Sequence, residues 1–83
     1  MIQFKNTNLT EVTFPNGTCF KKFEIMKDGD HRGEEICSIF ETMLGDFRIT
    51  LADHNRGNIS RVFYDAAGNK LEHKVVEERY FSN

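Results

Sequence analysis

The sequence predicts an α+β fold in which a mostly antiparallel sheet of about five to six strands packs, in two layers, against one α-helix. Three observations lead to this prediction. Residues 33–44 carry an apolar stripe with the period of a helix. The flanking segments alternate between polar and apolar residues or are rich in β-formers, and clusters of turn residues separate them. The expected order along the chain is β-β-β-α-β-β-β.

The predicted helix covers Gly33–Leu44. Its apolar stripe has the i, i+3, i+4, i+7, i+8 spacing of one helix face and consists of Ile36, Ile39, Phe40, Met43 and Leu44. Asp28 or Asp30 is expected to cap the first turn, and Gly45 to end the helix. A single short helix is not stable alone in water, so we expect it to pack on a sheet formed by the rest of the chain.

Three extended segments are expected before this helix. A short strand at Ile2–Lys5 comes first. Leu9–Phe14 and Thr18–Met26 then form a hairpin, because the Pro-Asn-Gly sequence at 15–17 between them is a strong turn signal. Proline presets φ for such a turn, and Asn-Gly accepts positive φ.

Three more strands are expected after the helix. Asp46–Ala52 alternates cleanly, which predicts a strand with one buried face. Ile59–Tyr64 is the next strand, and Asp65–Asn69 is a turn. Lys70–Phe81 fits a strand or a short helix, and the preceding turn favours the strand.

Residues 64–69, with the sequence Tyr-Asp-Ala-Ala-Gly-Asn, resemble the Tyr-Asp-x-x-Gly-Asn core of the YD hairpin repeats of large bacterial surface and toxin proteins. The resemblance covers six residues and occurs once. We interpret it as a recurrent hairpin turn, and it implies no function.

Composition predicts one small domain over residues 1–83. The chain is 39% hydrophobic and contains eight phenylalanines, enough for a core. A net charge of −2 and a pI of about 5.9 argue against a general binder of nucleic acid or membrane surfaces. The N-terminus lacks a signal-peptide apolar region and no long apolar run occurs, so a cytoplasmic location without membrane contact is expected. Cys19 and Cys37 are interpreted as reduced, buried thiols.

Catalytic and metal motifs are weak in this chain. Residues 28–33 begin like a calcium loop, but position 5 is Arg32 and position 12 is Ile39. No nucleophile elbow or phosphate-binding loop is found. The sequence therefore predicts no enzyme, metal or cofactor. An alternative is a minimal metal-dependent hydrolase around Asp53, His54 and His73.

Charge is unevenly distributed along the chain and provides two candidate binding surfaces. The first is acidic, includes the outer side of the predicted helix, and consists of Asp28, Asp30, Glu34, Glu35, Glu41 and Asp46. It would suit a partner protein with a basic surface. The second is basic, lies on the last hairpin, and consists of Arg56, Arg61, Lys70 and Lys74, with Phe63 and Tyr64 between them. Such a mixture of charges and rings is found in proteins that bind RNA or single-stranded DNA.

The preferred hypothesis is a non-catalytic protein-binding accessory factor that docks on a larger host or cognate protein. Its size and style are typical of small phage or mobile-element proteins that block host machinery, so the hypothesis includes a viral inhibitor. A homodimer formed through an edge strand, Ile2–Lys5 or Lys70–Phe81, is a further expectation. Nucleic-acid binding through the basic hairpin is the alternative.

Overall fold

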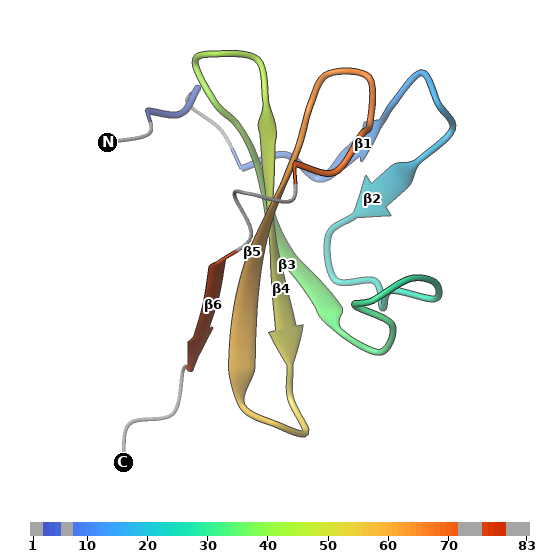
Figure 1. Ribbon diagram of the computed structural model, residues 1–83, viewed down its shortest axis with the longest axis vertical. Helices are drawn as coiled ribbons and strands as arrows, with labels where there is room; N and C mark the ends of the chain where they lie inside the picture. Colours follow the sequence, from blue (N-terminus) through green and yellow to red (C-terminus); the bar gives the residue numbers. More distant parts are fainter. Residues whose placement is uncertain (1–2, 6–7, 72–75, 80–83) are drawn as a thin grey trace.

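The computed structural model describes residues 3–5, 8–71 and 76–79, and this part of the chain is all-β (Figure 1). Its strands are β1 (Glu11–Thr13), β2 (Cys19–Lys21), β3 (Glu35–Glu41), β4 (Phe47–Asp53), β5 (Asn58–Tyr64) and β6 (Val76–Arg79). β1 and β2 form a two-stranded antiparallel sheet, and β3 to β6 form a four-stranded antiparallel sheet in sequence order. No helix occurs in the described residues, so the predicted α+β class is wrong.

The predicted helix over Gly33–Leu44 is in fact strand β3 followed by a turn. A β-bulge at Cys37 explains why this strand carries apolar residues at a helical spacing. Ile36 and Ile39 both pair with core residues of β4, and the register between the two strands shifts by one residue between these pairs. An extra residue in one strand moves every later side chain to the other face. Ile36 and Ile39 therefore share the core face although they are three positions apart.

The last two residues of the predicted stripe lie in the turn between β3 and β4. Met43 and Leu44 are both exposed, Leu44 to 87%. The backbone N–H of Thr42 donates to the carbonyl of Asp46 (2.7 Å), and Gly45 has a φ of +92°, a conformation that favours glycine. Gly45 therefore closes a hairpin, and the two side chains at the end of the stripe are mostly exposed.

The other predicted strands are mostly confirmed, and those of the first hairpin are shorter than predicted. β1 and β2 lie within the predicted hairpin, and β4 and β5 match the two strands predicted after the helix to within a residue. β6 lies within the predicted strand Lys70–Phe81, of which residues 72–75 and 80–81 are outside the described residues. Ile2 is also outside them, and Phe4 forms an isolated bridge with Thr42.

The N-terminal segment covers one half of the outer edge of β3. The backbone N–H groups of Lys5 and Leu9 donate to the carbonyls of Glu41 (2.8 Å) and Ile39 (2.7 Å). The side chain of Asn8 accepts a hydrogen bond from the N–H of Ile39 (3.0 Å). These bonds satisfy backbone groups that would otherwise be open at the end of the sheet.

Residues 23–26 cover the other half of the same edge. The N–H of Phe23 donates to the carbonyl of Ile36 (2.6 Å), and the N–H of Ile36 donates to the carbonyl of Glu24 (2.8 Å). One step further along, the N–H of Met26 donates to the carbonyl of Glu34 (2.8 Å). This pairing places the loop that follows, residues 27–34, at one end of the sheet.

The core lies between the four-stranded sheet and the β1–β2 hairpin. Its buried residues are Phe14, Phe20, Ile36, Ile39, Ile49, Leu51, Val62 and Tyr64. The ring of Phe14 lies centrally, with centroids 5.1 Å from Phe47, 6.1 Å from Tyr64 and 6.2 Å from Phe20. An aromatic side chain removes roughly 150–250 Å² from water when buried, so Phe14 and Phe20 hold the hairpin to the sheet.

The turn after β5 also contacts the hairpin, as Figure 1 shows. The side-chain amide of Asn16 donates to the carbonyl of Gly68 (3.0 Å), and a Cβ at Gly68 would collide with that side chain. The predicted turn at 65–69 is confirmed. Asp65 closes it by accepting backbone hydrogen bonds at Oδ1 from Asn69 (2.9 Å) and Ala67 (3.0 Å), and these bonds lower the pKa of Asp65.

Deletion of Cys37 tests the bulge. Without this residue, Ile36 and Ile39 would be two positions apart, as in a regular strand, and both would still face the core. We expect the deleted chain to fold cooperatively, as measured by urea denaturation. Deletion of Ser60 in the regular strand β5 is the control, because it would turn the core residues that follow it to the wrong face and unfold the domain. Equal damage from both deletions would contradict the assignment.

The pH dependence of stability tests the Asp65 turn. Hydrogen bonds, the backbone bond from Asn69 foremost, lower the native pKa of Asp65, so its carboxylate stabilises the fold above the unfolded pKa of about 3.9. This contribution is lost as the pH falls through the native pKa. Between about pH 6 and pH 2, urea denaturation should therefore show a larger loss of stability for wild type than for Asp65→Asn. The same loss in both proteins would contradict the expectation.

Candidate functional site

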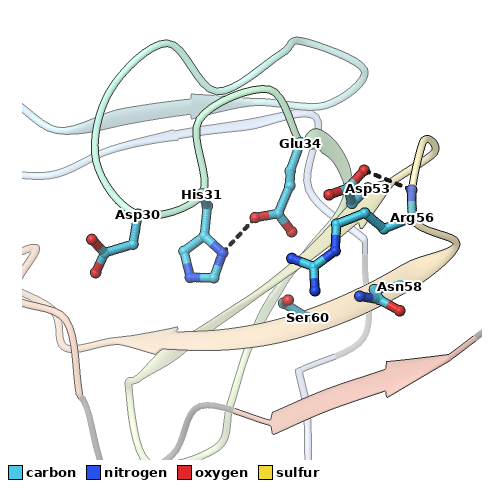
Figure 2. A pocket seen from close by; sticks show the side chains of 7 residues that line it. All are labelled: Asp30, His31, Glu34, Asp53, Arg56, Asn58 and Ser60. Carbon is cyan, nitrogen blue, oxygen red and sulfur yellow. Dashed lines mark hydrogen bonds and ion pairs between the residues drawn. The ribbon is translucent and has the colours of Figure 1, made fainter.

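Polar residues from three parts of the fold line a pocket of about 200 Å³ (Figure 2), which we call the polar pocket. They come from the loop before β3, from the end of β4 and the turn after it, and from β5. They are Asp30, His31, Glu34, Asp53, Arg56, Asn58 and Ser60. The lining contains acids, a base and neutral polar groups, so it can contact a ligand of mixed charge.

The turn between β4 and β5 positions Arg56. Asp53, the last residue of β4, accepts hydrogen bonds at Oδ1 from the backbone N–H groups of Asn55 and Arg56, both at 3.1 Å. The N–H of Gly57 donates to the carbonyl of Asp53 (2.8 Å). An aspartate that caps its own turn in this way restricts the backbone. The Arg56 side chain reaches from this turn over the pocket, and it forms no ion pair with a carboxylate of the described residues (Figure 2).

A hydrogen bond between His31 and Glu34 holds the loop on the opposite side of the pocket. His31 Nδ1 lies 2.7 Å from Glu34 Oε2, and the two side chains are only 14% and 11% exposed. A carboxylate can only accept, so Nδ1 carries the proton. The loop backbone is fixed in addition by a hydrogen bond from the N–H of Gly33 to the carbonyl of Met26 (2.9 Å). We therefore expect the contributions of His31 and Glu34 to the free energy of unfolding to be coupled.

Asn58 and Ser60 form the β5 side of the pocket. The register pairs Asn58 with Asp53 and Ser60 with Leu51, so both lie on the core-facing side of the sheet. Asn58 is 8% exposed and Ser60 4%. Oδ1 of Asn58 has no hydrogen-bond partner among the described residues. Burial of a polar group without a partner is unfavourable, so this amide is a local cost to stability.

The residues of the predicted acidic surface are spread over the molecule. Asp28 and Asp30 are exposed in the loop before β3, Glu34 is buried in the polar pocket, and Asp46 lies in the turn after β3. Glu35 and Glu41 are the two ends of β3, which at about 3.3 Å per residue lie about 20 Å apart. The helix side on which these residues were expected does not exist.

Several of these carboxylates have cationic or histidine partners. Lys5 Nζ lies 2.8 Å from Glu41, His54 Nε2 lies 2.7 Å from Glu35, and Lys70 Nζ lies 3.6 Å from Asp30. Their charge is partly balanced within the molecule. Their role in binding a partner stays a prediction.

The structure does not bring the predicted basic residues onto one surface. Arg56 lines the polar pocket, and Lys70 forms an ion pair with Asp30. Arg61 pairs with Thr50, which places it on the opposite face of β5 from Ser60. Lys74 lies outside the described residues. Nucleic-acid binding through these residues stays a prediction.

The residues of the metal-dependent alternative are also engaged otherwise. Asp53 caps the turn after β4, His54 bonds to Glu35, and His73 lies outside the described residues. Among the residues that the structure describes, no group of three or more metal-ligating side chains is placed to hold a metal ion.

The two cysteines have different surroundings. Cys37 is half-buried, and burial followed by the charge of Glu35 raises the pKa of its thiol. Cys19 is exposed, and its sulfur accepts a hydrogen bond from the hydroxyl of Thr13 (3.4 Å). Both are free cysteines, but the prediction that both are buried is wrong for Cys19.

A second candidate site is the exposed apolar segment after β2. Phe23 is 69% exposed and Ile25 52%, and we call these two residues the Phe23 surface. The N–H of Glu24 donates to the carbonyl of Lys21 (3.2 Å), which makes Phe23 the third residue of a turn. Its φ is +72°, and no other described residue besides glycine has a positive φ. A bulky residue in this conformation is a genuine outlier.

A groove of about 530 Å³ adjoins the Phe23 surface. Its lining combines apolar residues of the core region with polar and charged ones: Ile25, Phe20, Met26, Ile36 and Tyr64, then Gly17, Thr18 and Cys19, then Glu24, Lys27 and Asp28. Apolar side chains next to charged ones are typical of sites that bind a protein segment.

The sequence contained a signal for one of these two sites. In β5, alternation places Asn58 and Ser60 on the same face as Val62 and Tyr64, so polar residues at core-facing positions were visible. The Phe23 surface had no comparable signal, because phenylalanine is among the last residues expected at a positive φ.

No family model, curated protein or solved structure matches this chain. The expectations of an inhibitor, of viral origin and of a homodimer find no support, and the α+β description that accompanied them is wrong. Within the described residues, no helix is long and apolar enough to cross a membrane.

A double-mutant cycle tests whether His31 and Glu34 act as one unit. We expect a coupling free energy of about 1–2 kcal/mol between His31→Ala and Glu34→Ala, because a partly buried, charge-assisted hydrogen bond is lost only once. The more exposed pair Lys5–Glu41 is the control and should couple by less than about 1 kcal/mol. Urea denaturation of the four proteins in each cycle measures both values. Additive effects at His31 and Glu34 would contradict the proposed unit.

Proposed function

We propose that this chain is a non-catalytic, cytoplasmic protein-binding domain whose contact site is the Phe23 surface with its adjoining groove. The observation that carries the proposal is the conformation of Phe23. This residue combines a positive φ with a ring that is 69% exposed.

Both features of Phe23 are unfavourable for the isolated chain. A sparsely populated backbone conformation costs on the order of 1–3 kcal/mol, and the third position of this kind of turn is normally glycine or asparagine. The exposed ring recovers little of the roughly 1.5–3 kcal/mol that burial of a phenylalanine provides. Phe23 thus lowers the stability of the isolated chain in two ways. This supports a role for it in binding.

Local charge indicates the kind of partner. Lys21 and Lys22 directly precede Phe23, while Glu24, Lys27 and Asp28 line the adjoining groove. Lys22 Nζ lies 5.1 Å from the centroid of the Phe23 ring, so a positive charge borders the apolar surface directly. We therefore propose that the partner presents a large apolar side chain flanked by carboxylates.

The acidic residues are a weaker candidate for the same function. Glu34 is buried with His31, and Glu35 and Glu41 have partners of their own. A partner that used these carboxylates would have to replace existing interactions. A partner that binds the Phe23 surface would replace no such interaction, because the apolar atoms of this surface are exposed to water.

Phe23→Asn separates binding from stability. Asparagine tolerates a positive φ, so we expect the free energy of unfolding to be unchanged or higher by up to about 1 kcal/mol. Phe20→Ala, in the core, should by contrast lower it by about 3–5 kcal/mol. Urea denaturation measures both. A large loss of stability in Phe23→Asn would show that the ring serves the fold.

Peptide-display selection then tests binding directly. Wild type should enrich peptides with a large apolar residue between Asp or Glu residues, and Phe23→Asn should not retain them. Leu44→Asn is the matched control, because Leu44 is also exposed and apolar but lies in the turn after β3. This variant should retain the same peptides. Enrichment of the same peptides by Phe23→Asn, or of none by wild type, would refute the proposal.

A further inference from the structure

The backbone of β2 has an outer edge that faces away from β1. β2 (cyan in Figure 1) pairs with β1 and with no other strand of the described residues. At one end of this ladder the N–H of Phe14 donates to the carbonyl of Thr18 (2.8 Å). Bonded and non-bonded pairs alternate along an antiparallel ladder, so the next bonded residue is Phe20. Cys19 and Lys21 therefore direct their backbone N–H and C=O groups away from β1.

Three of these four backbone groups have no hydrogen-bond partner among the described residues. They are the N–H and C=O of Cys19 and the N–H of Lys21. The C=O of Lys21 accepts a hydrogen bond from the N–H of Glu24 (3.2 Å). The outer edge of β3, by contrast, is paired along both of its halves. A row of open donors and acceptors is a template on which an extended segment can pair.

The groove of about 530 Å³ lies along this open edge. Cys19 and Phe20 line it from β2, and Ile36 and Tyr64 supply apolar side chains. Burial alternates along β2, with Cys19 and Lys21 exposed on either side of the buried Phe20. Directly opposite residues of paired strands point to the same face of the sheet. In a strand added at this edge, the side chain opposite Phe20 would therefore point toward the apolar part of the groove.

The same alternation agrees with the kind of partner proposed above. The two neighbours of that apolar residue would lie opposite Cys19 and Lys21, on the exposed face. A carboxylate opposite Lys21 is favourable, because opposite charges on directly opposite residues stabilise a strand pair. An extended segment with a large apolar residue between acidic ones thus fits both the edge of β2 and the groove beside it.

We propose that the partner binds as an extended segment that adds a strand to the outer edge of β2 and fills the groove. Backbone hydrogen bonds to Cys19 and Lys21 hold the segment, and the groove selects its apolar side chain. Phe23 lies two residues beyond the end of β2, within reach of the same segment. This inference rests on the proposed function, because it concerns the same site, and it adds the conformation of the partner.

Amide hydrogen exchange of ¹⁵N-labelled protein tests strand addition. The probe is a synthetic copy of a peptide that the wild-type protein enriches by display. At saturation it should slow the exchange of the Cys19 and Lys21 N–H groups by about tenfold or more, because both become hydrogen-bonded. Glu11 and Thr13 are the matched controls, since the same register leaves their N–H groups on the outer edge of β1, and their exchange should not change.

Cys19→Pro provides a second test. Proline has no N–H and is tolerated on an edge strand where that N–H faces outward, so we expect the domain to fold. The affinity for the peptide should fall by about tenfold or more, because a peptide carbonyl is left without its donor. Cys19→Ala keeps the N–H and should bind as wild type does. The amide spectrum without peptide reports folding, and the exchange measurement decides alone if Cys19→Pro is unfolded.

The outcomes separate this inference from the proposal on which it rests. A peptide that is lost on Phe23→Asn, but binds wild type without slowing exchange at Cys19 and Lys21, would overturn strand addition alone. Equal affinity of folded Cys19→Pro and Cys19→Ala would do the same. Enrichment of no peptide by wild type would overturn both proposals.

Discussion

The fold depends on the backbone hydrogen bonds along both edges of β3. On one side β3 pairs with β4, and on the other it pairs with two segments that are far apart in the sequence. A strand at the end of a sheet exposes a row of unsatisfied donors and acceptors, which is costly and invites association. The described residues solve this problem locally, because the N-terminal segment and residues 23–26 each cover half of the edge. Among the described residues, the other end of the sheet is β6.

The bulge at Cys37 lies between these two covered halves. It keeps Ile36 and Ile39 on the core face while the strand changes its outer partner from residues 23–26 to the N-terminal segment. This pairing also determines the position of a surface loop. Because Met26 pairs with Glu34, the loop between them is held against the end of the sheet, where His31 meets the groups at the end of β4 and the start of β5. The polar pocket thus follows from the way in which an edge strand is covered.

The sequence was sufficient for the strands whose periodicity and turn chemistry agree. The Pro-Asn-Gly turn predicted the first hairpin, and clean alternation predicted β4 almost to the residue. It was insufficient for β3, because a bulge converts a period of two into a spacing of three that mimics a helix. Ile36 and Ile39 are β-branched, a side-chain type that is enriched in strands, in agreement with the structure. The error carried over to function, since the acidic surface was placed on the outer side of that helix.

Two features that lower the stability of the fold lie near the same half of β3. The first is Phe23, with its strained backbone and exposed ring, whose N–H donates to the carbonyl of Ile36. The second is the buried amide of Asn58, which lines the same pocket as Glu34, two residues before Ile36. The hairpin side, around the ring of Phe14, shows ordinary dense aromatic packing. Selection for stability alone would favour glycine or asparagine at position 23 and a satisfied or apolar residue at position 58. Because such departures gather where proteins meet their ligands, this end of the molecule is where function is to be sought.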